Sequence, residues 1–205
     1  TNPNLMNKQP VGADLKSVPS MRSTKRIIVL GYTGTGKTTF VQELINQEIK
    51  KPFHRVIIIT PDDSEWLQYE YADLINPSEF NFSGVRRHIF NEEYSMKMIT
   101  DYAYDALIIF DDCRFYFTAN IEKELHGFLI RSRQHMVDIV AVGHSFTEVP
   151  PKFFTFASHI VLFHTKDNIN KRKDVIKDFL RMVRAQERVN NKSFSDIHYK
   201  EIIKQ

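Results

Sequence analysis

The stretch from Gly31 to Thr38 constrains the fold of this 205-residue chain more than any other. Its sequence, GYTGTGKT, matches the pattern G-x-x-x-x-G-K-[ST], in which a glycine-rich loop turns its backbone N–H groups toward phosphate oxygens. The apolar run RIIVLG, at 26–31, precedes the loop, and the residues at 37–50 carry apolar side chains at helical spacing. A buried strand, this loop and a helix in that order predict an α/β nucleotide-binding domain.

The loop residues predict a division of labour around a bound nucleotide. Lys37 is expected to reach the β- and γ-phosphates of ATP, Thr38 to bind Mg²⁺, and Thr39 to contact the α-phosphate. The positive end of the helix that begins near Lys37 adds to the attraction for phosphate. The predicted nucleotide-binding residues are Gly31, Tyr32, Thr33, Gly34, Thr35, Gly36, Lys37, Thr38 and Thr39.

A second motif lies at 106–112, where the apolar run ALIIF is followed by Asp111 and Asp112. An acid at the end of a buried strand is typical of a Walker B motif, so Asp111 is expected to hold Mg²⁺. Asp112 is expected to orient or deprotonate the attacking water. An acid directly after the metal-binding acid favours hydrolysis over phosphate transfer to a small molecule.

Polar residues follow a further apolar strand at 137–143. If this strand lies between the strands of the two motifs, His144 points toward the γ-phosphate and senses or polarises it. Arg131 and Arg133 precede the strand, at the end of a predicted helix. Either arginine could stabilise phosphate charge in a neighbouring subunit, or both could be solvated residues that a helix C-terminus favours in any case.

Apolar runs alternate with helical patterns along the chain, which predicts a parallel sheet covered by helices on both faces. We expect a three-layer P-loop sandwich with a five-stranded parallel core, of the RecA/HerA-like type that has an extra strand between the strands of the two motifs. The strands are predicted at 26–31, 55–60, 106–111, 137–143 and 159–163, and helices at 37–50, 64–72, 92–104, 121–133 and 175–189.

Charge divides the chain into three parts. Residues 1–25 hold four Lys/Arg and one Asp and are predicted to form an extended arm, because prolines and polar residues occur there without periodicity. Residues 26–165 form the predicted ATPase core, with 13 Lys/Arg and 18 Asp/Glu. Residues 166–205 hold 11 Lys/Arg and six Asp/Glu and are predicted to be a basic helical segment packed on or beside the core. Basic ends are compatible with nucleic acid and equally with solvated surfaces.

No apolar run approaches the roughly 18 residues that a membrane-spanning helix needs, so no membrane span is expected. The single cysteine, Cys113, excludes an internal disulfide and fits a reducing compartment.

The stretch 131–163, RSRQHMVDIVAVGHSFTEVPPKFFTFASHIVLF, resembles the corresponding segment of HerA–FtsK superfamily ATPases. The stretches IIITPDD and LIIFDD are similar to the genome-packaging ATPases of that superfamily from poxvirus-like and other membrane-containing double-jelly-roll viruses. Residues 31–38 match the family's P-loop, Asp111 its metal-binding acid and Asp112 its catalytic acid. Arg133 falls where the family has an arginine. His144 stands where the family usually has a glutamine, and an imidazole adds a pH dependence that an amide lacks.

The motifs and the resemblance together predict a Mg²⁺-dependent ATPase that translocates double-stranded DNA, as in packaging a viral genome into a preformed capsid. A homo-oligomeric ring, pentameric or hexameric, is expected, with Arg133 reaching a neighbour's site. A capsid or membrane vertex protein is a possible partner, and the host cytoplasm or the virion vertex is the expected location. A phage assembly or secretion ATPase acting on protein cargo and a nucleotide kinase are the alternatives. Asp112 disfavours the kinase, and the lack of an apolar span disfavours the secretion motor.

Overall fold

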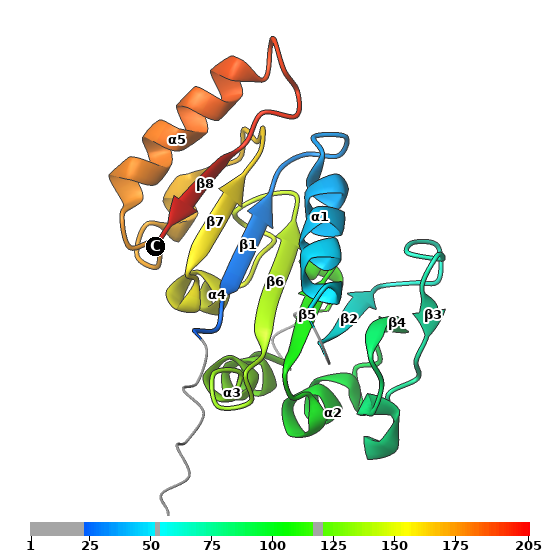
Figure 1. The fold of residues 1–205 in the computed structure, drawn as a ribbon. Coiled ribbons are helices and arrows are strands. Elements are labelled where there is room, and N and C mark those ends of the chain that lie inside the picture. Colours follow the sequence, from blue (N-terminus) through cyan, green and yellow to red (C-terminus); the bar gives the residue numbers. More distant parts are fainter. Residues whose placement is uncertain (1–22, 52–53, 117–120) are drawn as a thin grey trace, which may run out of the picture.

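The computed structural model describes residues 23–51, 54–116 and 121–205. Its centre is an eight-stranded sheet in the order β3-β4-β2-β5-β6-β1-β7-β8, in which β8 alone is antiparallel to its neighbour (Figure 1). The strands are β1 (Arg26–Leu30), β2 (Arg55–Thr60), β3 (Glu70–Tyr71), β4 (Gly84–Ile89), β5 (Ala106–Phe110), β6 (Asp138–Gly143), β7 (His159–Leu162) and β8 (Glu201–Lys204).

The five predicted strands form the contiguous centre of this sheet, β2-β5-β6-β1-β7. All of them run parallel, because the chain crosses back over a face of the sheet between one strand and the next. Strand β6 pairs with β1 on one side and with β5 on the other. The expected extra strand between the two motif-bearing strands is therefore confirmed, and it brings the carboxyl ends of β1, β5 and β6 together.

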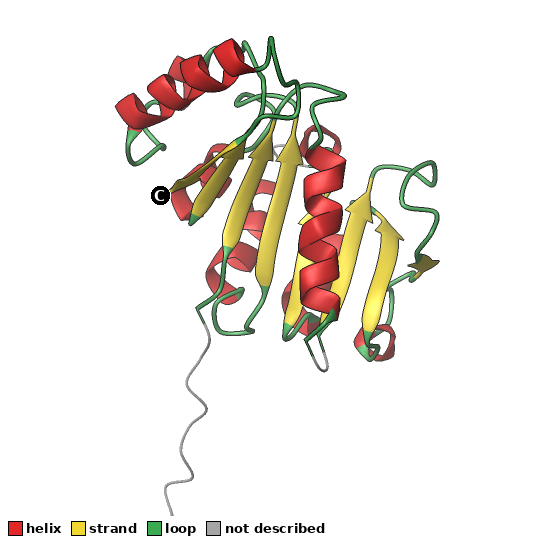
Figure 2. Ribbon diagram, turned by 45° about the horizontal axis from the view of Figure 1, so that its top comes forward, coloured by secondary structure: helices red, strands yellow, loops and turns green. Residues whose placement is uncertain are grey.

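Helices cover both faces of the sheet (Figure 2). Helix α1 (Lys37–Ile49) packs on one face, and α2 (Ser95–Tyr102), α3 (Glu122–Arg131) and α4 (Pro151–Phe156) pack on the other. Helix α5 (Phe179–Lys192) lies beside β7 and β8. Short 3-10 helices are η1 (Pro77–Phe80), η2 (Cys113–Phe115) and η4 (Ile169–Arg172).

Alternating residues of the central strands enter two separate cores, because successive side chains of a strand point to opposite faces. Val29 and Val140 pack against Val41 of α1 in one core. Ile28 and Ile139 share the other core with α2, α3 and α4. Because helices cover both faces of the sheet, every residue of β5 and β6 is buried. The predicted three-layer α/β sandwich is confirmed.

The predicted helix at 64–72 is wrong. This stretch forms a turn, with Trp66 in the left-handed region at φ 60°, and then the short edge strand β3. The rings of Trp66 and Tyr69 stack within this turn, with their centroids 6.3 Å apart. Tertiary contacts of Trp66 outweigh the weak local propensity for a helix.

Besides β3, two strands of the sheet were not predicted. Strand β4 has a polar sequence, GVRRHI, because it lies near the sheet edge, where Arg86 and Arg87 reach Glu70 and Asp63. Strand β8 lies in the segment expected to be helical, and it extends the sheet by pairing with β7. Its apolar part is too short to distinguish from a helix by periodicity. The divisions at residues 25 and 165 stay predictions, and the predicted arm lies mostly outside the described residues.

Among the residues that the structure describes, no helix is both long enough and apolar enough to cross a membrane.

Candidate active site

A cleft of about 580 Å³ opens at the carboxyl ends of the central strands. Parallel sheets commonly bind ligands at this edge, where the strand order reverses direction around the first strand. Most of the residues predicted to bind the nucleotide line this cleft. They lie in the segments that follow β1, β5 and β6 and at the beginning of α1. The predicted residues that line it are Thr33, Gly34, Gly36, Lys37, Thr38, Thr39, Asp111, Asp112 and His144.

The loop after β1 leads directly into α1, whose N-terminus faces the cleft. Gly36 caps this helix with φ 99°, a conformation that favours glycine. Gly31 is needed for close packing, since a Cβ there would lie 2.5 Å from Cβ of Phe163. Thr35 turns inward, and its hydroxyl donates to the carbonyl oxygen of Tyr32 at 2.8 Å. Gly31, Tyr32 and Thr35 thus shape the back of the loop and do not line the cleft.

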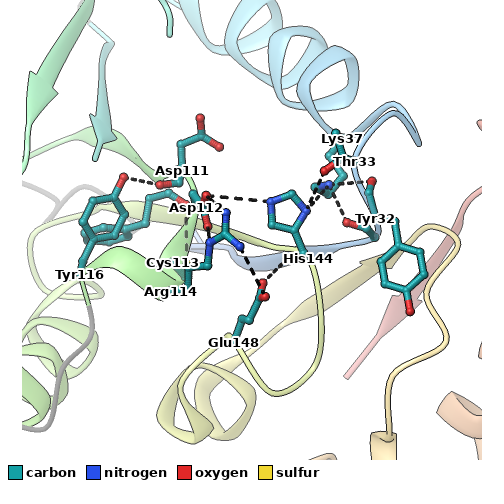
Figure 3. A network of polar contacts seen from close by, with 12 residues as sticks. Tyr32, Thr33, Lys37, Asp111, Asp112, Cys113, Arg114, Tyr116, His144 and Glu148 are labelled. Carbon is teal, nitrogen blue, oxygen red and sulfur yellow. Dashed lines mark hydrogen bonds and ion pairs between the residues drawn. The ribbon is translucent and has the colours of Figure 1, made fainter. Parts of the chain in front are cut away.

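The side chain of Tyr32 points away from the cleft (Figure 3). Its hydroxyl oxygen accepts a hydrogen bond from the backbone N–H of Lys166 at 3.1 Å, and its ring meets His164 edge to face, with centroids 5.5 Å apart. Its contacts with the chain after β7 indicate that Tyr32 holds the loop against the C-terminal segment.

Lys37 is only 8% exposed, and its ammonium group is held by its own loop. Nζ donates to the carbonyl oxygens of Gly31 at 2.5 Å and Tyr32 at 2.9 Å. Burial lowers the pKa of Lys37, an effect that the nearby Asp111 and Asp112 carboxylates oppose. The lysine therefore folds back over the loop, at the level where phosphate groups would bind.

His144 lies between Lys37 and Asp112 (Figure 3). Its Nδ1 is 3.5 Å from Nζ of Lys37, and since an ammonium group only donates, Nδ1 must be the acceptor. The proton of the neutral ring is then on Nε2, which is 3.9 Å from Oδ2 of Asp112. Burial, followed by the charge of Lys37, lowers the pKa of His144. The imidazole is thus neutral at pH 7, with its Nε2–H on the side of Asp112.

Glu148 fixes the backbone beneath this imidazole. Its Oε2 accepts a hydrogen bond from the backbone N–H of His144 at 2.9 Å. Its other oxygen is 4.0 Å from Nη1 of Arg114. This carboxylate ties the loop after β6 to the residues that follow β5.

Asp112 has φ 56°, a left-handed conformation that is uncommon for an aspartate and turns its side chain into the cleft. Nη2 of Arg114 donates a hydrogen bond to Oδ2 at 3.1 Å, and Nε lies 3.0 Å from Oδ1 as an ion-pair contact without hydrogen-bond geometry. Asp112 is oriented by Arg114 on one side and faces His144 on the other.

Asp111 is buried beneath Asp112 and accepts a hydrogen bond at Oδ2 from Nε1 of Trp66 at 2.7 Å. Its carbonyl oxygen accepts from the hydroxyl of Tyr116. Burial raises the pKa of Asp111 to about 7, and the nearby Glu65 adds to the effect. A desolvated carboxylate of this kind gains most from a nearby cation.

The donors in the cleft fit Mg²⁺. Thr38, Asp111 and Glu65 offer hard oxygen atoms. Within the described ranges, no three His, Cys, Asp or Glu side chains gather as a self-sufficient metal cage. Mg²⁺ commonly binds through one or two carboxylates together with substrate phosphates, so this sparse set is suitable.

The structure does not bring Arg131 and Arg133 to this cleft. Both precede β6, whose opposite end carries His144, so the length of a strand separates them from the site. Arg131 reaches Asp101 of α2, with Nη1 3.1 Å from Oδ1. Arg133 is exposed. Their assignment to a neighbouring subunit's site stays a prediction.

Sequence reasoning missed Glu65 and His198, which line the cleft from the turn after β2 and the turn before β8. It also missed Trp66 and Glu148, which do not line the cleft but hydrogen-bond to Asp111 and to the backbone of His144. Arg114 also lines the cleft and had no role assigned from the sequence. None of these positions belongs to a local motif, although Arg114 follows Asp112 by two residues and Glu148 follows His144 by four.

The structure is similar in fold to solved genome packaging NTPases of archaeal viruses. B204 of Sulfolobus turreted icosahedral virus 2, in complex with sulfate, is 14% identical, with TM-score 0.59 and 90% of this chain and 98% of that chain covered. Its complex with AMPPCP is also 14% identical, with TM-score 0.61 and coverage of 88% and 97%. B204 of Sulfolobus turreted icosahedral virus, described as a DNA-packaging ATPase, is 13% identical, with TM-score 0.60 and coverage of 87% and 96%.

No curated protein matches the chain. A family model described as poxvirus A32 protein matches residues 17–198, which is most of the sequence. The resemblance to the packaging ATPases of poxvirus-like viruses is thereby confirmed. The chain belongs to the poxvirus A32 protein family.

Proposed function

We propose that this chain is a Mg²⁺-dependent ATPase that moves double-stranded DNA into a preformed viral capsid. The observation that carries the proposal is the convergence of Lys37, Asp111, Asp112 and His144 on one cleft at the N-terminus of α1. Membership of the poxvirus A32 family and the fold shared with viral packaging NTPases support the biological setting.

Phosphate binding would begin with the loop amides and the positive end of α1. Lys37 exchanges its contacts with the carbonyl oxygens of Gly31 and Tyr32 for the β- and γ-phosphate oxygens. Those carbonyl contacts keep the ammonium group in place before the nucleotide arrives. Thr38 and Asp111 would hold Mg²⁺, which neutralises charge on the phosphates when bound.

Asp112 would accept the proton of the attacking water. Arg114 and the left-handed backbone aim its carboxylate into the cleft. His144 carries its ring proton on Nε2 and would donate a hydrogen bond to the γ-phosphate or to that water. Each group contributes by position and charge, as expected for phosphoryl transfer.

Hydrolysis of ATP by the wild type and two variants tests the chemistry. Lys37→Ala should lose both ATP binding and phosphate release. Asp112→Asn should still bind ATP but release phosphate at least about a hundredfold more slowly, because a general base contributes roughly that much. Lys50→Ala, which removes an exposed lysine just beyond the end of the same helix, is the matched control. Wild-type rates in both site variants would exclude an ATPase at this cleft.

DNA translocation is proposed from the family and from the basic segment 166–205. Exposed arginines of α5, such as Arg181 and Arg184, belong to this segment. Duplex DNA should stimulate hydrolysis at low salt, and the stimulation should fade as salt rises, because phosphate contacts release counterions. An unchanged rate with duplex DNA at low salt would refute the DNA motor and favour protein cargo.

A ring of five or six subunits, with Arg133 acting on the neighbour's ATP, is part of the same proposal. A mixture of Lys37→Ala and Arg133→Ala subunits provides the test, because a Lys37→Ala subunit can supply the arginine to an intact neighbouring site. Recovery of hydrolysis on mixing is the expected result. Failure to recover, or a protein that stays monomeric with ATP analogue and DNA, would exclude the arginine's role between subunits. The host cytoplasm or the virion vertex, with a capsid or membrane protein there, is the proposed setting.

A further inference from the structure

The turn between α5 and β8 places His198 at the nucleotide cleft. His198 lines the cleft together with Gly36, Thr38 and Thr39, at the beginning of α1. A Cβ built on Gly36 would lie 3.1 Å from Nδ1 of His198 and 3.7 Å from Cγ. A residue 162 positions along the chain from Gly36 thus lies in contact distance of the loop.

Neighbouring contacts hold this turn in place. The backbone N–H of His198 donates to Oδ1 of Asp196 at 3.0 Å, and that of Tyr199 donates to the Asp196 carbonyl oxygen at 3.0 Å. Nζ of Lys200 lies 5.6 Å from the ring centroid of Phe40 and 5.7 Å from that of Phe163, within cation–π range. The turn is therefore anchored on α1 and on the residue that follows β7.

The imidazole of His198 lies against Gly36 but is not held there by a polar contact. The side chain is exposed, and among the described residues its ring atoms form no hydrogen bond or ion pair. An exposed aromatic ring at the rim of a nucleotide cleft is suited to receive another flat ring.

The order of the strands decides which part of the nucleotide reaches this ring. The catalytic acids follow β5, on one side of β1, whereas His198 precedes β8, on the other side. The γ-phosphate must face Asp112 and His144. The α-phosphate then lies near Thr39, and the ribose and base continue away from β5, toward β7 and β8.

We infer that His198 stacks on the nucleobase of ATP and supplies a base-binding contact of the cleft. The inference rests on the proposed ATPase function. A stacking contact adds affinity for any nucleobase, since every base has a π-face, so it should strengthen GTP binding as well as ATP binding.

Calorimetric titration with Mg²⁺ present tests the inference with two probes, ATP and inorganic tripolyphosphate, which lacks the base. His198→Ala should weaken ATP binding roughly fivefold or more, as expected for a lost base–aromatic stack, and leave tripolyphosphate binding unchanged. His198→Phe, which keeps an aromatic face, should restore ATP affinity. Phe194→Ala is the control, because Phe194 belongs to the same turn, is 84% exposed and does not line the cleft.

Two outcomes would overturn the inference: equal ATP affinity in His198→Ala and wild type, or an equal loss for ATP and tripolyphosphate. The Lys37→Ala variant distinguishes these two outcomes from a failure of the proposed ATPase function. That variant should lose affinity for both probes, and wild-type affinity for both would overturn the ATP site itself.

Discussion

Nε1 of Trp66 donates a hydrogen bond of 2.7 Å to Oδ2 of Asp111, across 45 residues of sequence. Trp66 is 6% exposed and adopts φ 60°, an outlier for so bulky a side chain. Unfavourable backbone of this kind persists where surrounding contacts demand it, and here it directs the indole N–H at the proposed metal-binding acid.

Trp66→Phe should weaken the site through Asp111, because an aromatic side chain remains but the indole N–H donor is lost, together with part of the ring volume. We expect the Mg²⁺ concentration for half-maximal hydrolysis to rise about tenfold, as when the hydrogen bond that orients a metal ligand is removed. The free energy of unfolding should fall by about 1–3 kcal/mol, since a buried acceptor loses its partner. Tyr69→Phe removes only the hydroxyl from the ring that stacks on Trp66, and it should leave the Mg²⁺ requirement unchanged.

His144 should make the rate of ATP hydrolysis fall in acidic solution. Its pKa is lowered below 6.5, so the neutral ring persists at pH 7 and becomes protonated only in more acidic solution. Protonation removes the Nδ1 acceptor and places a second positive charge beside Lys37. The wild-type rate should therefore fall as pH decreases below about 6.5, and His144→Gln should lack that fall. Rates measured from pH 5 to pH 8 check this, and identical profiles would contradict it.

Glu148 should act by positioning His144. Glu148→Ala removes the acceptor for the His144 backbone N–H, so the imidazole loses its fixed place and kcat should fall while KM for ATP changes little. Glu148→Gln keeps an oxygen acceptor at the same position and should restore most of kcat. A loss of kcat that is the same in both variants would show that charge, and not the hydrogen bond to His144, is what matters.

His88 should make the fold sensitive to acid. Its Nδ1 is 2.9 Å from the carbonyl oxygen of Ala72, so Nδ1–H donates there, and Nε2 accepts from the hydroxyl of Ser95 at 2.7 Å. The ring is fully buried, and burial lowers its pKa. As pH falls below about 6.5 the unfolded chain takes up a proton that the folded protein resists, so stability declines.

Chemical unfolding at several pH values checks this expectation. His88→Gln should show a smaller decline in stability between pH 7 and pH 5 than the wild type, whatever its stability at pH 7. His126→Gln, at a half-exposed histidine on α3, is the control. An equal decline in wild type and His88→Gln would assign the acid sensitivity to other groups.

The predictable part of the fold consists of strands buried on both faces. Continuous apolar runs form β1, β2, β5, β6 and β7. Such a run can be recognised from only a few residues of sequence. β4 and β8 carry polar residues because they lie toward the sheet edges, so no such run marks them. The turn around Trp66 defeated a helix prediction because its conformation depends on a distant partner, Asp111.

The sequence by itself determined the phosphate loop and the paired acids, because each is a local pattern in which adjacent residues share one turn of backbone. Only the tertiary structure decided that His198 lines the cleft and that Trp66 and Glu148 hold Asp111 and His144 in place there. They arrive there through strand order and through turns whose residues carry no common spacing. Hydrogen bonds and ring contacts across such distances in sequence arise from packing, which a pattern along the chain does not encode.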